Sequence, residues 1–430
     1  MIPRYSHPEM AGLWTDEAKY ASWVRVELLA CEAQAELGVL SPAELAEIRT
    51  GRVPTPQRVA ELEKDRDHEI LAFLAAYTET IDGRAARWVH HGMTSYDLVD
   101  TALGHTLAQA CDLVLAAGRQ LRDVLARRAL EHWDTVCVAR THGIHAEPTT
   151  FGHKLAVHAL AVHRTLERLG AARTKVAVGT ISGAVGTYAQ IDPFVERYVC
   201  ERLGLGCEPV PTQVVARDRH ADLVSTLALF GAVVEQVALE LRLLQRTEVR
   251  EVEEPRTAGY QGSSAMPHKR NPTSSERLCG LARVLRANAS AVLENVALWH
   301  ERDLAHSSVE RIVFPDSFQA LHYQLRSATE VIEGLRVFPD RMRRNLDATN
   351  GLIYSSVVML DLVAAGTDRE SAYRTVQAAA TETWESERPL IETLQERGIA
   401  VQPEQFDPRR FLTQNSLLRE RLEEIIHVEV

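Results

Sequence analysis

DRHADLVSTLALFGAVVEQVALELRLLQRTEVREVEE, residues 218–254, carries the longest helical pattern of the chain. Ala, Leu and Val recur through it without a proline, and only Gly231 interrupts the pattern. The pattern predicts one helix, which at roughly 1.5 Å per residue would reach about 50 Å. Because its apolar residues cover more than one narrow stripe, we expect this helix to be buried inside a bundle or a subunit interface.

Helical periodicity extends on both sides of this stretch. Residues 14–37 predict a helix that closes at Gly38, and Ser41 with Pro42 then caps the next one. Further long patterns rich in Ala and Leu occupy residues 97–130 and 151–169, whereas strand signals are short, at residues 136–139 and 175–178. We therefore predict an all-α protein with a central bundle of long helices.

Breaks in the helical pattern divide the chain. They cluster at residues 92–95, 179–193 and 255–272, and after Pro339 a charged segment is followed by shorter helices. With 430 residues the chain exceeds what one hydrophobic core usually holds. We expect an N-terminal helical domain at 1–92, a central helical-bundle domain at 93–341, which contains the loop 262–272, and a C-terminal helical domain at 342–430.

The composition argues against several classes of protein. Forty-eight basic and fifty-nine acidic side chains leave a net charge of −11, which disfavours nucleic acid or an anionic membrane as a partner. The six cysteines form no CxxC pair, so neither a disulfide framework nor a cysteine zinc site is expected. The N-terminus lacks the pattern of a signal peptide, and no run of about eighteen uncharged apolar residues occurs. We expect a soluble, cytoplasmic protein.

Residues 262–272, GSSAMPHKRNP, form the most distinctive loop of the chain. Its small residues include two adjacent serine hydroxyls, and Lys269, Arg270 and Asn271 place cationic and amide donors within reach of an anion. This combination favours a loop that handles a carboxylate and carries a candidate base. A solvated surface loop is the alternative interpretation.

Two further segments carry polar side chains that suit a site. Residues 67–69, DHE, lie on an expected helix, where a surface charge run is the alternative to a functional His68. Residues 90–95, HHGMTS, end one helix, and Thr94, Ser95 or Asp97 would cap the next. Capping is compatible with anion binding, because a helix N-terminus presents unpaired amides to either group.

Residues 140–148, RTHGIHAEP, contain two histidines three positions apart. No third ligand completes a known zinc pattern with them, so no metal site is expected. His142, between Thr141 and Gly143 in a turn, suits an accessible acid or base, because imidazole titrates near neutrality. Core packing is the default interpretation for His145.

Several stretches resemble one enzyme family in the same order over nearly the whole chain. They are RTHGIHAEPTTFG, SGAVGTYAQIDPFVE, TQVVARDRHAD, EVREVEE, GSSAMPHKRNP and WHERDLAHSSVERIVFPD. Together they resemble the adenylosuccinate lyases of the fumarase/aspartase superfamily. The resemblance implies the three-domain fold of that superfamily and an elimination that releases fumarate. Adenylosuccinate lyases act on adenylosuccinate, to give AMP, and on succinylaminoimidazole-carboxamide ribotide, to give AICAR, in purine nucleotide biosynthesis.

The resemblance also implies catalytic roles. It makes Ser263 the general base and His142 the general acid that protonates the departing nitrogen. Glu276 would orient the acid, although a solvated helix glutamate is the alternative, and His68 would be a second active-site histidine. Removing a proton next to a carboxylate creates a doubly negative intermediate, which Lys269 would stabilise. No metal or organic cofactor is implied.

Substrate binding is implied for a larger set of residues. They are Arg4, Tyr5, Thr94, Ser95, Gln213, Ser264, Arg270, Asn271, Arg302, Ser307, Ser308 and Arg311. Arginines and hydroxyls are the expected clamps for an anionic, small-molecule succinyl-nucleotide substrate. Because these residues lie hundreds of positions apart, one subunit need not bring them together. Members of the family are homotetramers whose sites are each shared by three chains, and the apolar helix at 218–254 also favours such an assembly.

Five positions near the implied substrate contacts depart from the family pattern: Asp67, Glu69, Tyr96, His7 and Arg277. Extra negative charge beside a site for an anion costs affinity unless a cation compensates it, and Arg277 is a candidate for that compensation. A fumarate-releasing lyase acting on a different N-succinyl amine is therefore the second hypothesis. A non-catalytic structural relative is the third, and the intact acid, base and loop lysine argue against it.

Overall fold

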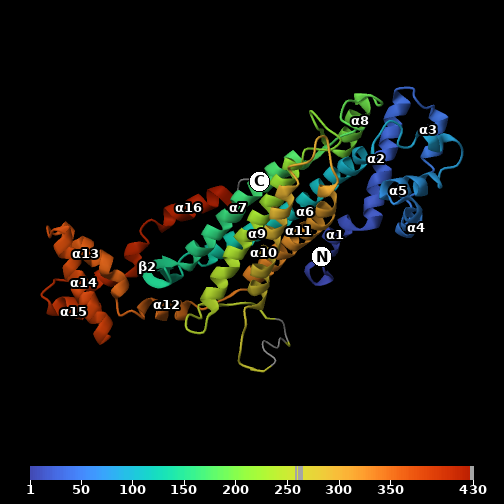
Figure 1. Ribbon diagram of the computed structural model, residues 1–430. Coiled ribbons are helices and arrows are strands. Elements are labelled where there is room, and N and C mark those ends of the chain that lie inside the picture. The colour runs from blue at the N-terminus through green and yellow to red at the C-terminus, as the bar shows by residue number, and fades with distance from the viewer. Residues whose placement is uncertain (257–258, 260–264, 427–430) are drawn as a thin grey trace. The chain divides into compact units, whose positions relative to one another are not determined.

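The computed structural model describes residues 1–256, 259 and 265–426, and within them the chain is mostly helical (Figure 1). This confirms the predicted all-α class. Five long helices dominate: α6 (Ser95–Glu131), α7 (Phe151–Val176), α9 (Arg217–Gln245), α10 (Thr273–Glu294) and α11 (Ala305–Glu333). In the described part of the chain, no helix combines the length and the hydrophobicity that crossing a membrane requires.

The chain divides into two compact units, and each long helix contributes a segment to both. Unit 1 comprises Met1–Arg119, Arg164–Val234 and Gly280–Arg326, and unit 2 comprises Gln120–His163, Glu235–Cys279 and Ser327–Val430. The three domains expected from the sequence, with boundaries at residues 92 and 341, remain a prediction.

Unit 1 also contains the short elements at the start of the chain and around α8. They are η1 (Pro3–Tyr5), α1 (Pro8–Ala11), η2 (Gly12–Trp14), α2 (Asp16–Glu36), α3 (Pro42–Ile48), α4 (Pro56–Arg66), α5 (Glu69–Thr78), η3 (Ala85–Trp88), β3 (Val178–Gly179), α8 (Pro193–Leu203) and β4 (Gly206–Cys207). The predicted cap at Ser41 is confirmed, because its side chain and that of Glu44 each accept from the backbone N–H of the other.

Unit 2 contains a β-hairpin and the C-terminal helices. Its elements are β1 (Val136–Thr141), β2 (Ile144–Thr150), β5 (Val252–Glu253), β6 (Arg336–Val337), α12 (Pro339–Asp347), η4 (Leu352–Tyr354), α13 (Ser355–Ala364), α14 (Arg369–Ser386), α15 (Leu390–Glu396), η5 (Pro403–Phe406), η6 (Pro408–Phe411) and α16 (Asn415–Ile426). Strand β1 pairs antiparallel with β2, and β5 pairs antiparallel with β6.

Two predictions about element bounds were wrong. The helix expected over residues 218–254 ends at Gln245, because Arg250 adopts a left-handed φ of 50° and the chain turns back so that Glu251 N–H donates to the Leu244 carbonyl. Residues beyond the turn form β5 instead. The strand expected at residues 175–178 begins only at Val178, in β3, since α7 continues to Val176.

Glycines let the long helices of unit 1 approach closely. A Cβ at Gly118 of α6 would lie 2.7 Å from Leu166 of α7 and 2.8 Å from Phe230 of α9. A Cβ at Gly231 of α9 would lie 2.4 Å from Leu285 of α10. Real Cβ atoms essentially never come this close to a neighbour, so a larger residue at either position would have to displace these side chains.

A buried ion cluster joins three of these helices inside unit 1. The Arg217 guanidinium of α9 donates to both carboxylate oxygens of Asp100 on α6, at 2.6 and 2.9 Å. The same guanidinium pairs with Glu310 of α11 at 3.0 Å. Arg217 and Asp100 are each 2% exposed, so the guanidinium must be paired to be tolerated there.

Candidate active site

The β1–β2 hairpin of unit 2 carries the predicted general acid at its turn. His142 and Gly143 are the two turn residues, with φ of 55° and 79°. A two-residue turn with positive φ at both positions matches the right-handed twist of the strands. His142 is exposed there, as its predicted role as an accessible acid requires.

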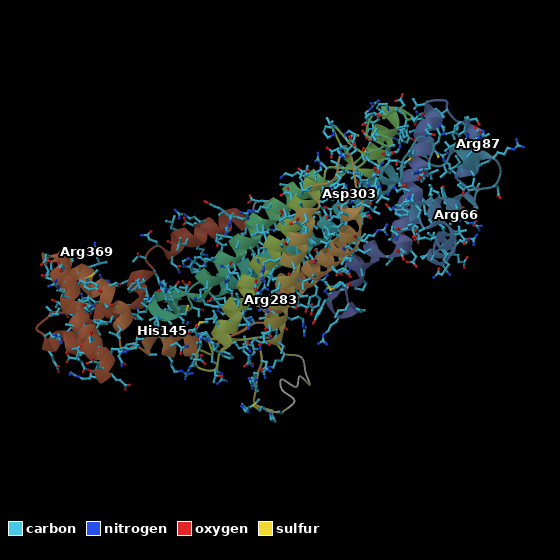
Figure 2. All side chains as sticks on the ribbon, in the orientation of Figure 1. Arg66, Arg87, His145, Arg283, Asp303 and Arg369 are labelled. Carbon is cyan, nitrogen blue, oxygen red and sulfur yellow. The ribbon has the colours of Figure 1, made fainter. Side chains whose placement is uncertain are left out.

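Buried polar contacts hold the base of this hairpin. Arg140 of β1 pairs with Glu251 at 2.6 Å, and the Asn345 side-chain amide of α12 donates to the same carboxylate at 2.7 Å. Glu251 is fully buried, so the contact is shielded from water. His145 is half-buried rather than part of the core, and burial lowers the pKa of its imidazole (Figure 2). Side chains from β1, from the stretch that contains Glu251 and from α12 therefore fix the hairpin that carries His142.

Ser263 and Ser264, the predicted base and carboxylate ligand, lie outside the described residues. Within the described segment that follows them, Arg270 donates to both oxygens of Glu253 in β5, at 3.1 and 3.0 Å. Glu253 is 4% exposed and also pairs with Arg256 and Arg336. Arg270 is thus part of an ion cluster at the base of the loop, besides its predicted role in substrate binding.

Glu254 fixes the N-terminus of α10, where the loop ends. Its carboxylate accepts from the backbone N–H groups of Ser274 and Ser275, at 3.2 and 2.7 Å, and from the Ser275 hydroxyl at 2.5 Å. Glu254 is 6% exposed. Glu254 was not among the candidates predicted from the sequence, although this residue ends the segment EVREVEE, which resembles the family. Glu253 and Glu254, side by side before the loop, bind residues that follow it.

Of the other candidates on this side of the loop, Lys269 and Glu276 are exposed and Asn271 is half-buried. The Lys269 ammonium has no partner in the described part of the chain, and its backbone N–H donates to the Met266 carbonyl. Asn271 precedes α10, and Glu276 is exposed on the first turn of that helix. Among the described residues, no hydrogen bond or ion pair joins Glu276 to His142, although both belong to unit 2. A single chain therefore does not bring the predicted acid and its orienting carboxylate together.

In unit 1, Asp97 fixes the start of α6. The sequence predicted Asp97 only as one of three possible caps for this helix. Asp97 accepts from the backbone N–H of Thr94 at 2.8 Å and from those of Ser182 and Gly183 at 2.9 and 3.1 Å. Burial raises the pKa of the Asp97 carboxyl to about 6, against the opposing effect of these donors. Thr94 and Ser95 are thereby held beside the segment SGAVG.

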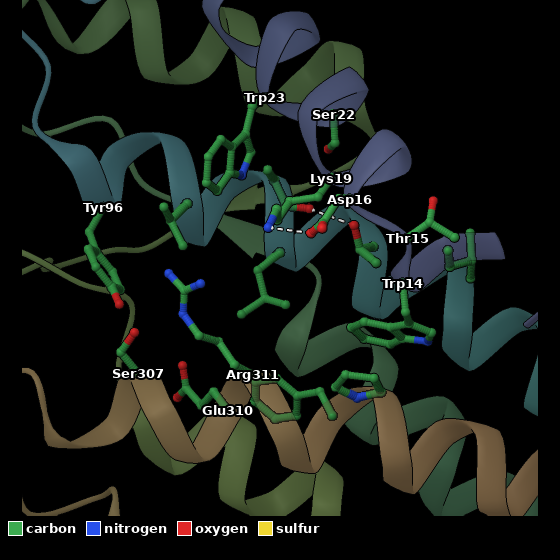
Figure 3. Close-up of a pocket in the computed structure, with 17 residues that line it drawn as sticks. Trp14, Thr15, Asp16, Lys19, Ser22, Trp23, Tyr96, Ser307, Glu310 and Arg311 are labelled. Carbon is green, nitrogen blue, oxygen red and sulfur yellow. Dashed lines mark hydrogen bonds and ion pairs between the residues drawn. The ribbon is translucent and has the colours of Figure 1, made fainter. Parts of the chain in front are cut away.

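Three predicted substrate-binding residues gather around Tyr96. Arg302 donates to the Gln213 side-chain carbonyl at 2.8 Å, and its guanidinium lies over the Tyr96 ring, 3.5 Å from the centroid. The Tyr96 hydroxyl is hydrogen-bonded to Ser307, and Figure 3 shows the two groups pointing toward each other. Tyr96 is 5% exposed. It holds an arginine and a serine of the predicted site in fixed positions.

A cavity of about 310 Å³ adjoins this group in unit 1 (Figure 3). Arg311 and Lys19 line it, and both pair with Glu69, each at 2.6 Å. Burial raises the pKa of the Glu69 carboxyl, but Lys19 and Arg311 outweigh burial and hold that pKa below its ordinary value. These two cations supply the compensation for Glu69 that the sequence suggested for Arg277.

His68 and Asp67 have local structural roles. His68 is the N-cap of α5, and its Nδ1 accepts from the Leu71 backbone N–H at 3.3 Å, which leaves Nε2 to carry the proton of a neutral ring. Asp67 ends α4 with φ 51° and ψ 33°. Aspartate tolerates this left-handed conformation better than most residues, which accounts for an acidic residue at this position.

The remaining predicted ligands lie near the start of the chain and of α11. Arg4 is exposed, and its guanidinium has no partner within the described ranges. Tyr5 packs edge-on against Tyr323, and His7 stacks on the same ring. Ser308 is exposed on the first turn of α11. In the part of the chain that the structure describes, Arg4 therefore offers an unpaired positive charge to an anionic ligand.

The arrangement suits acid–base chemistry on an anion. Unit 2 presents an exposed imidazole on a braced turn and an exposed lysine, whereas unit 1 presents arginines, hydroxyls and helix-start amides. No group of three or more His, Cys, Asp or Glu side chains in the described residues is arranged to hold a metal ion.

Comparison with known proteins assigns the chain to a family. A family model described as "Lyase" matches residues 4–286, and one described as "Adenylosuccinate lyase C-terminus" matches residues 351–422. The chain is 49% identical to an adenylosuccinate lyase of Bacillus subtilis (strain 168) over 98% of this chain and 99% of that protein. It is 47% identical to an adenylosuccinate lyase of Synechocystis sp., over 98% and 100% of the two chains.

Solved structures show the same fold. A fumarate lyase from Mesorhizobium sp. BNC1 superposes with a TM-score of 0.90 at 29% identity, covering 100% of both chains. A 3-carboxy-cis,cis-muconate lactonizing enzyme from Pseudomonas putida superposes with a TM-score of 0.88 at 28% identity, over 98% of this chain and 97% of that one. These superpositions confirm the fumarase/aspartase-like fold that the sequence predicted. The family models and the identities to known relatives show that the chain belongs to the adenylosuccinate lyase family.

Proposed function

We propose that this chain is a carbon–nitrogen lyase that eliminates fumarate from adenylosuccinate, giving AMP, and from succinylaminoimidazole-carboxamide ribotide, giving AICAR, in purine nucleotide biosynthesis. The observation that carries the proposal is the 49% identity to an adenylosuccinate lyase over almost the whole of both chains. The exposed His142 at a braced turn supports it, because the reaction needs a proton donor for the departing nitrogen.

In the proposed reaction, Ser263 removes the proton from the carbon next to a substrate carboxylate. The electron pair left behind is delocalised into that carboxylate, which becomes doubly negative. Lys269 and Asn271 stabilise this charge, and Ser264 binds the carboxylate. A serine hydroxyl is a poor base at its ordinary pKa, so positive charge such as that of Lys269 must favour its ionised form.

The second half of the reaction breaks the carbon–nitrogen bond. The electron pair returns to form the double bond of fumarate, the bonding pair leaves with the nitrogen, and His142 protonates that nitrogen. Glu276 would orient the imidazole and stabilise its charged form, and His68 would act beside the substrate. Arg302, Ser307, Ser308 and Arg311, together with Arg4, Tyr5, Thr94, Ser95, Gln213 and Arg270, would hold the nucleotide and succinyl groups.

We further propose that the chain works as a homotetramer whose sites are shared between subunits. The absence of a hydrogen bond or ion pair between His142 and Glu276 among the described residues supports this, as does the surface of α9. Leu229, Leu239 and Leu243 of that helix are 45%, 42% and 49% exposed. Large apolar side chains exposed along one long helix are typical of a subunit interface.

A cytoplasmic location is part of the proposal. All six cysteines are free thiols, which fits a reducing compartment.

The direct test mixes purified protein with adenylosuccinate and quantifies fumarate and AMP. Equal amounts of the two products are expected. A folded tetramer that releases neither product would contradict the proposal. A protein with Ser263→Ala is the control, because it should assemble normally and release almost nothing.

A second candidate, a fumarate-releasing lyase for a different N-succinyl amine, is favoured by one observation. Glu69 pairs with Arg311, a predicted phosphate ligand, and with Lys19, and so lowers the positive charge at this place from two to one. A less anionic substrate would need fewer free cations at this place. If adenylosuccinate is not cleaved, fumarate release from other N-succinyl amines, including ones without phosphate, would establish this candidate.

A further inference from the structure

Two cavities of unit 2 meet at the hairpin that carries His142. The first, of about 640 Å³, is lined by Ile144 of the hairpin, by Leu352 and by one face of α14, including Trp384. The second, of about 460 Å³, is lined by arginines. Both cavities share Gly143, His145 and Ala348 in their linings, so they adjoin each other, and we call the pair the groove.

The first half of this groove offers a flat aromatic surface to solvent. Trp384 is 68% exposed and Ile144 is 67% exposed, which is unusual for such large apolar side chains. Gln377 and Thr381 line the same cavity and offer hydrogen-bonding groups beside the indole. A flat heteroaromatic ring with polar edges is the ligand chemistry that such a surface recognises.

The second half carries an excess of positive charge. Arg140, Arg246, Arg341 and Arg344 line it, against the carboxylate of Glu248 on its wall and that of Glu251 bonded to Arg140. Four cations and two anions leave two positive charges in excess. Arg341 donates to the Val249 and Glu248 carbonyls, at 3.0 and 2.6 Å, so its position is set while its charge stays unneutralised.

Arg344 is the cation most available to a ligand. It is exposed on α12, and it has no hydrogen bond or ion pair with any residue that the structure describes. Arg246 donates to the Leu243 carbonyl at 3.2 Å and pairs with Glu248 at 3.5 Å, and the Arg246 and Glu248 side chains are 48% and 68% exposed. Arginine forks bind phosphate through paired N–H donors.

We propose that this groove is a second binding site, for a purine nucleoside monophosphate, with the base on Trp384 and the phosphate on Arg344, Arg246 and Arg341. The two halves match the two ends of such a ligand, and each cavity lies within the size range of small-molecule sites. The site is separate from the predicted ligands of unit 1. It is also independent of the proposed reaction, since it needs none of the catalytic residues.

The site has a direct connection to the proposed chemistry. Gly143 and His145, which follow His142 by one and three positions, line both halves of the groove. A ligand seated there contacts the turn whose φ angles set the direction of the His142 side chain.

The test is equilibrium dialysis of AMP against the full-length protein, counting nucleotides bound per chain. The double variant Trp384→Ala, Arg344→Gln is expected to bind one AMP fewer per chain than the unmodified protein. The matched control, Tyr373→Ala with Arg343→Gln, changes an exposed aromatic residue of α14 and an exposed arginine of α12 that do not line the groove. It should bind as the unmodified protein does.

The count separates this proposal from the proposed function. If the chain is an adenylosuccinate lyase, its active site adds one further AMP, which both variants keep. If it is not, the double variant binds none and the unmodified protein one. An unchanged count in the double variant overturns the groove assignment in either case.

Ligand fragments test the chemical class. Each single variant should weaken AMP binding about tenfold, the scale of one base stacked on an aromatic ring or one lost arginine contact. Adenosine and inorganic phosphate should each bind at least about tenfold more weakly than AMP, because each uses one half of the groove. Equal affinity for AMP and either fragment would overturn the assignment to a nucleotide.

Discussion

At the scale of single residues, His142 combines an exposed imidazole with a left-handed backbone. We expect His142→Asn to lower kcat by about 10²–10⁴-fold, the usual contribution of a general acid. Asparagine tolerates positive φ, so the hairpin and the melting temperature should be retained. Stopped-time assays of fumarate and a thermal melt check the two expectations. A kcat within threefold of the unmodified enzyme, a margin of about 0.7 kcal/mol, would remove His142 from the mechanism.

Glu69 sets how much positive charge faces the cavity of unit 1. Glu69→Gln removes the shared partner of Lys19 and Arg311, so affinity for a phosphorylated substrate should rise and KM should fall. Glu61→Gln, which removes an exposed carboxylate paired with Arg58, is the control and should leave KM unchanged. Steady-state kinetics at low ionic strength makes the comparison. A raised KM in Glu69→Gln would mean that the carboxylate positions these cations for the substrate.

His322 gives a prediction about pH. Burial lowers the pKa of its imidazole from 6.5 to about 4. A folded-state pKa below the unfolded value means that the unfolded chain binds the proton first. The contribution to stability is therefore complete above pH 6.5 and is lost as pH falls toward 4. Denaturant unfolding of His322→Phe should show a shallower loss of stability across this window than the unmodified protein. If the free energy of unfolding fell equally steeply with pH in both proteins, the lowered pKa of His322 would be contradicted.

At the scale of elements, Glu254 ties the start of α10 to the stretch before the loop. Glu254→Ala removes three hydrogen bonds and should lower the free energy of unfolding by about 1–3 kcal/mol, the range for losing partners of buried donors. Because the loop holds Ser263 and Lys269, kcat should fall as well.

The N-cap Asp368 of α14 provides the matched control for this change. Asp368→Ala also removes a carboxylate from a helix start, where it accepts from the Ser371 N–H at 3.0 Å. Asp368→Ala should also lower the free energy of unfolding, because it leaves the Ser371 N–H without its acceptor. It should leave kcat unchanged. If both variants retain full kcat, Glu254 acts only on stability.

Elements differ in how far they could be predicted from the sequence. Helices α6 and α7 follow the apolar pattern, and Ser41 carries a complete capping signal in four residues. The end of α9 carries no such local signal, because the residues beyond it form β5, which pairs with β6 some eighty residues further along. Long-range pairing of this kind overrides helical periodicity.

The candidate site divides in the same way. His142 and the loop could be found because turn residues and serines beside cations carry chemistry in their types. Glu254, Asp97 and Lys19 were missed or underestimated because their roles depend on contacts with distant segments. Glu69 shows the reverse error: its charge was visible, but its partners Lys19 and Arg311 lie 50 or more positions away.

At the scale of the whole molecule, assembly is the main untested expectation. Leu243→Glu places a charge on the exposed apolar surface of α9 and should dissociate the proposed tetramer and abolish activity together. Leu417→Glu on α16, where the leucine is 40% exposed, is the control for adding a carboxylate. Sedimentation velocity and activity are measured on the same samples. An unmodified chain that is active as a monomer would refute shared sites.

The buried cluster of Arg217, Asp100 and Glu310 also bears on how this chain can diverge. One guanidinium pairs with carboxylates from two other helices, so replacing Arg217 leaves two buried negative charges without their counter-ion. Substitution of Arg217 alone should therefore be purged by selection. Among related sequences, the three positions are therefore expected to stay invariant or to be replaced together, as a covarying triplet that marks the packing of α6, α9 and α11.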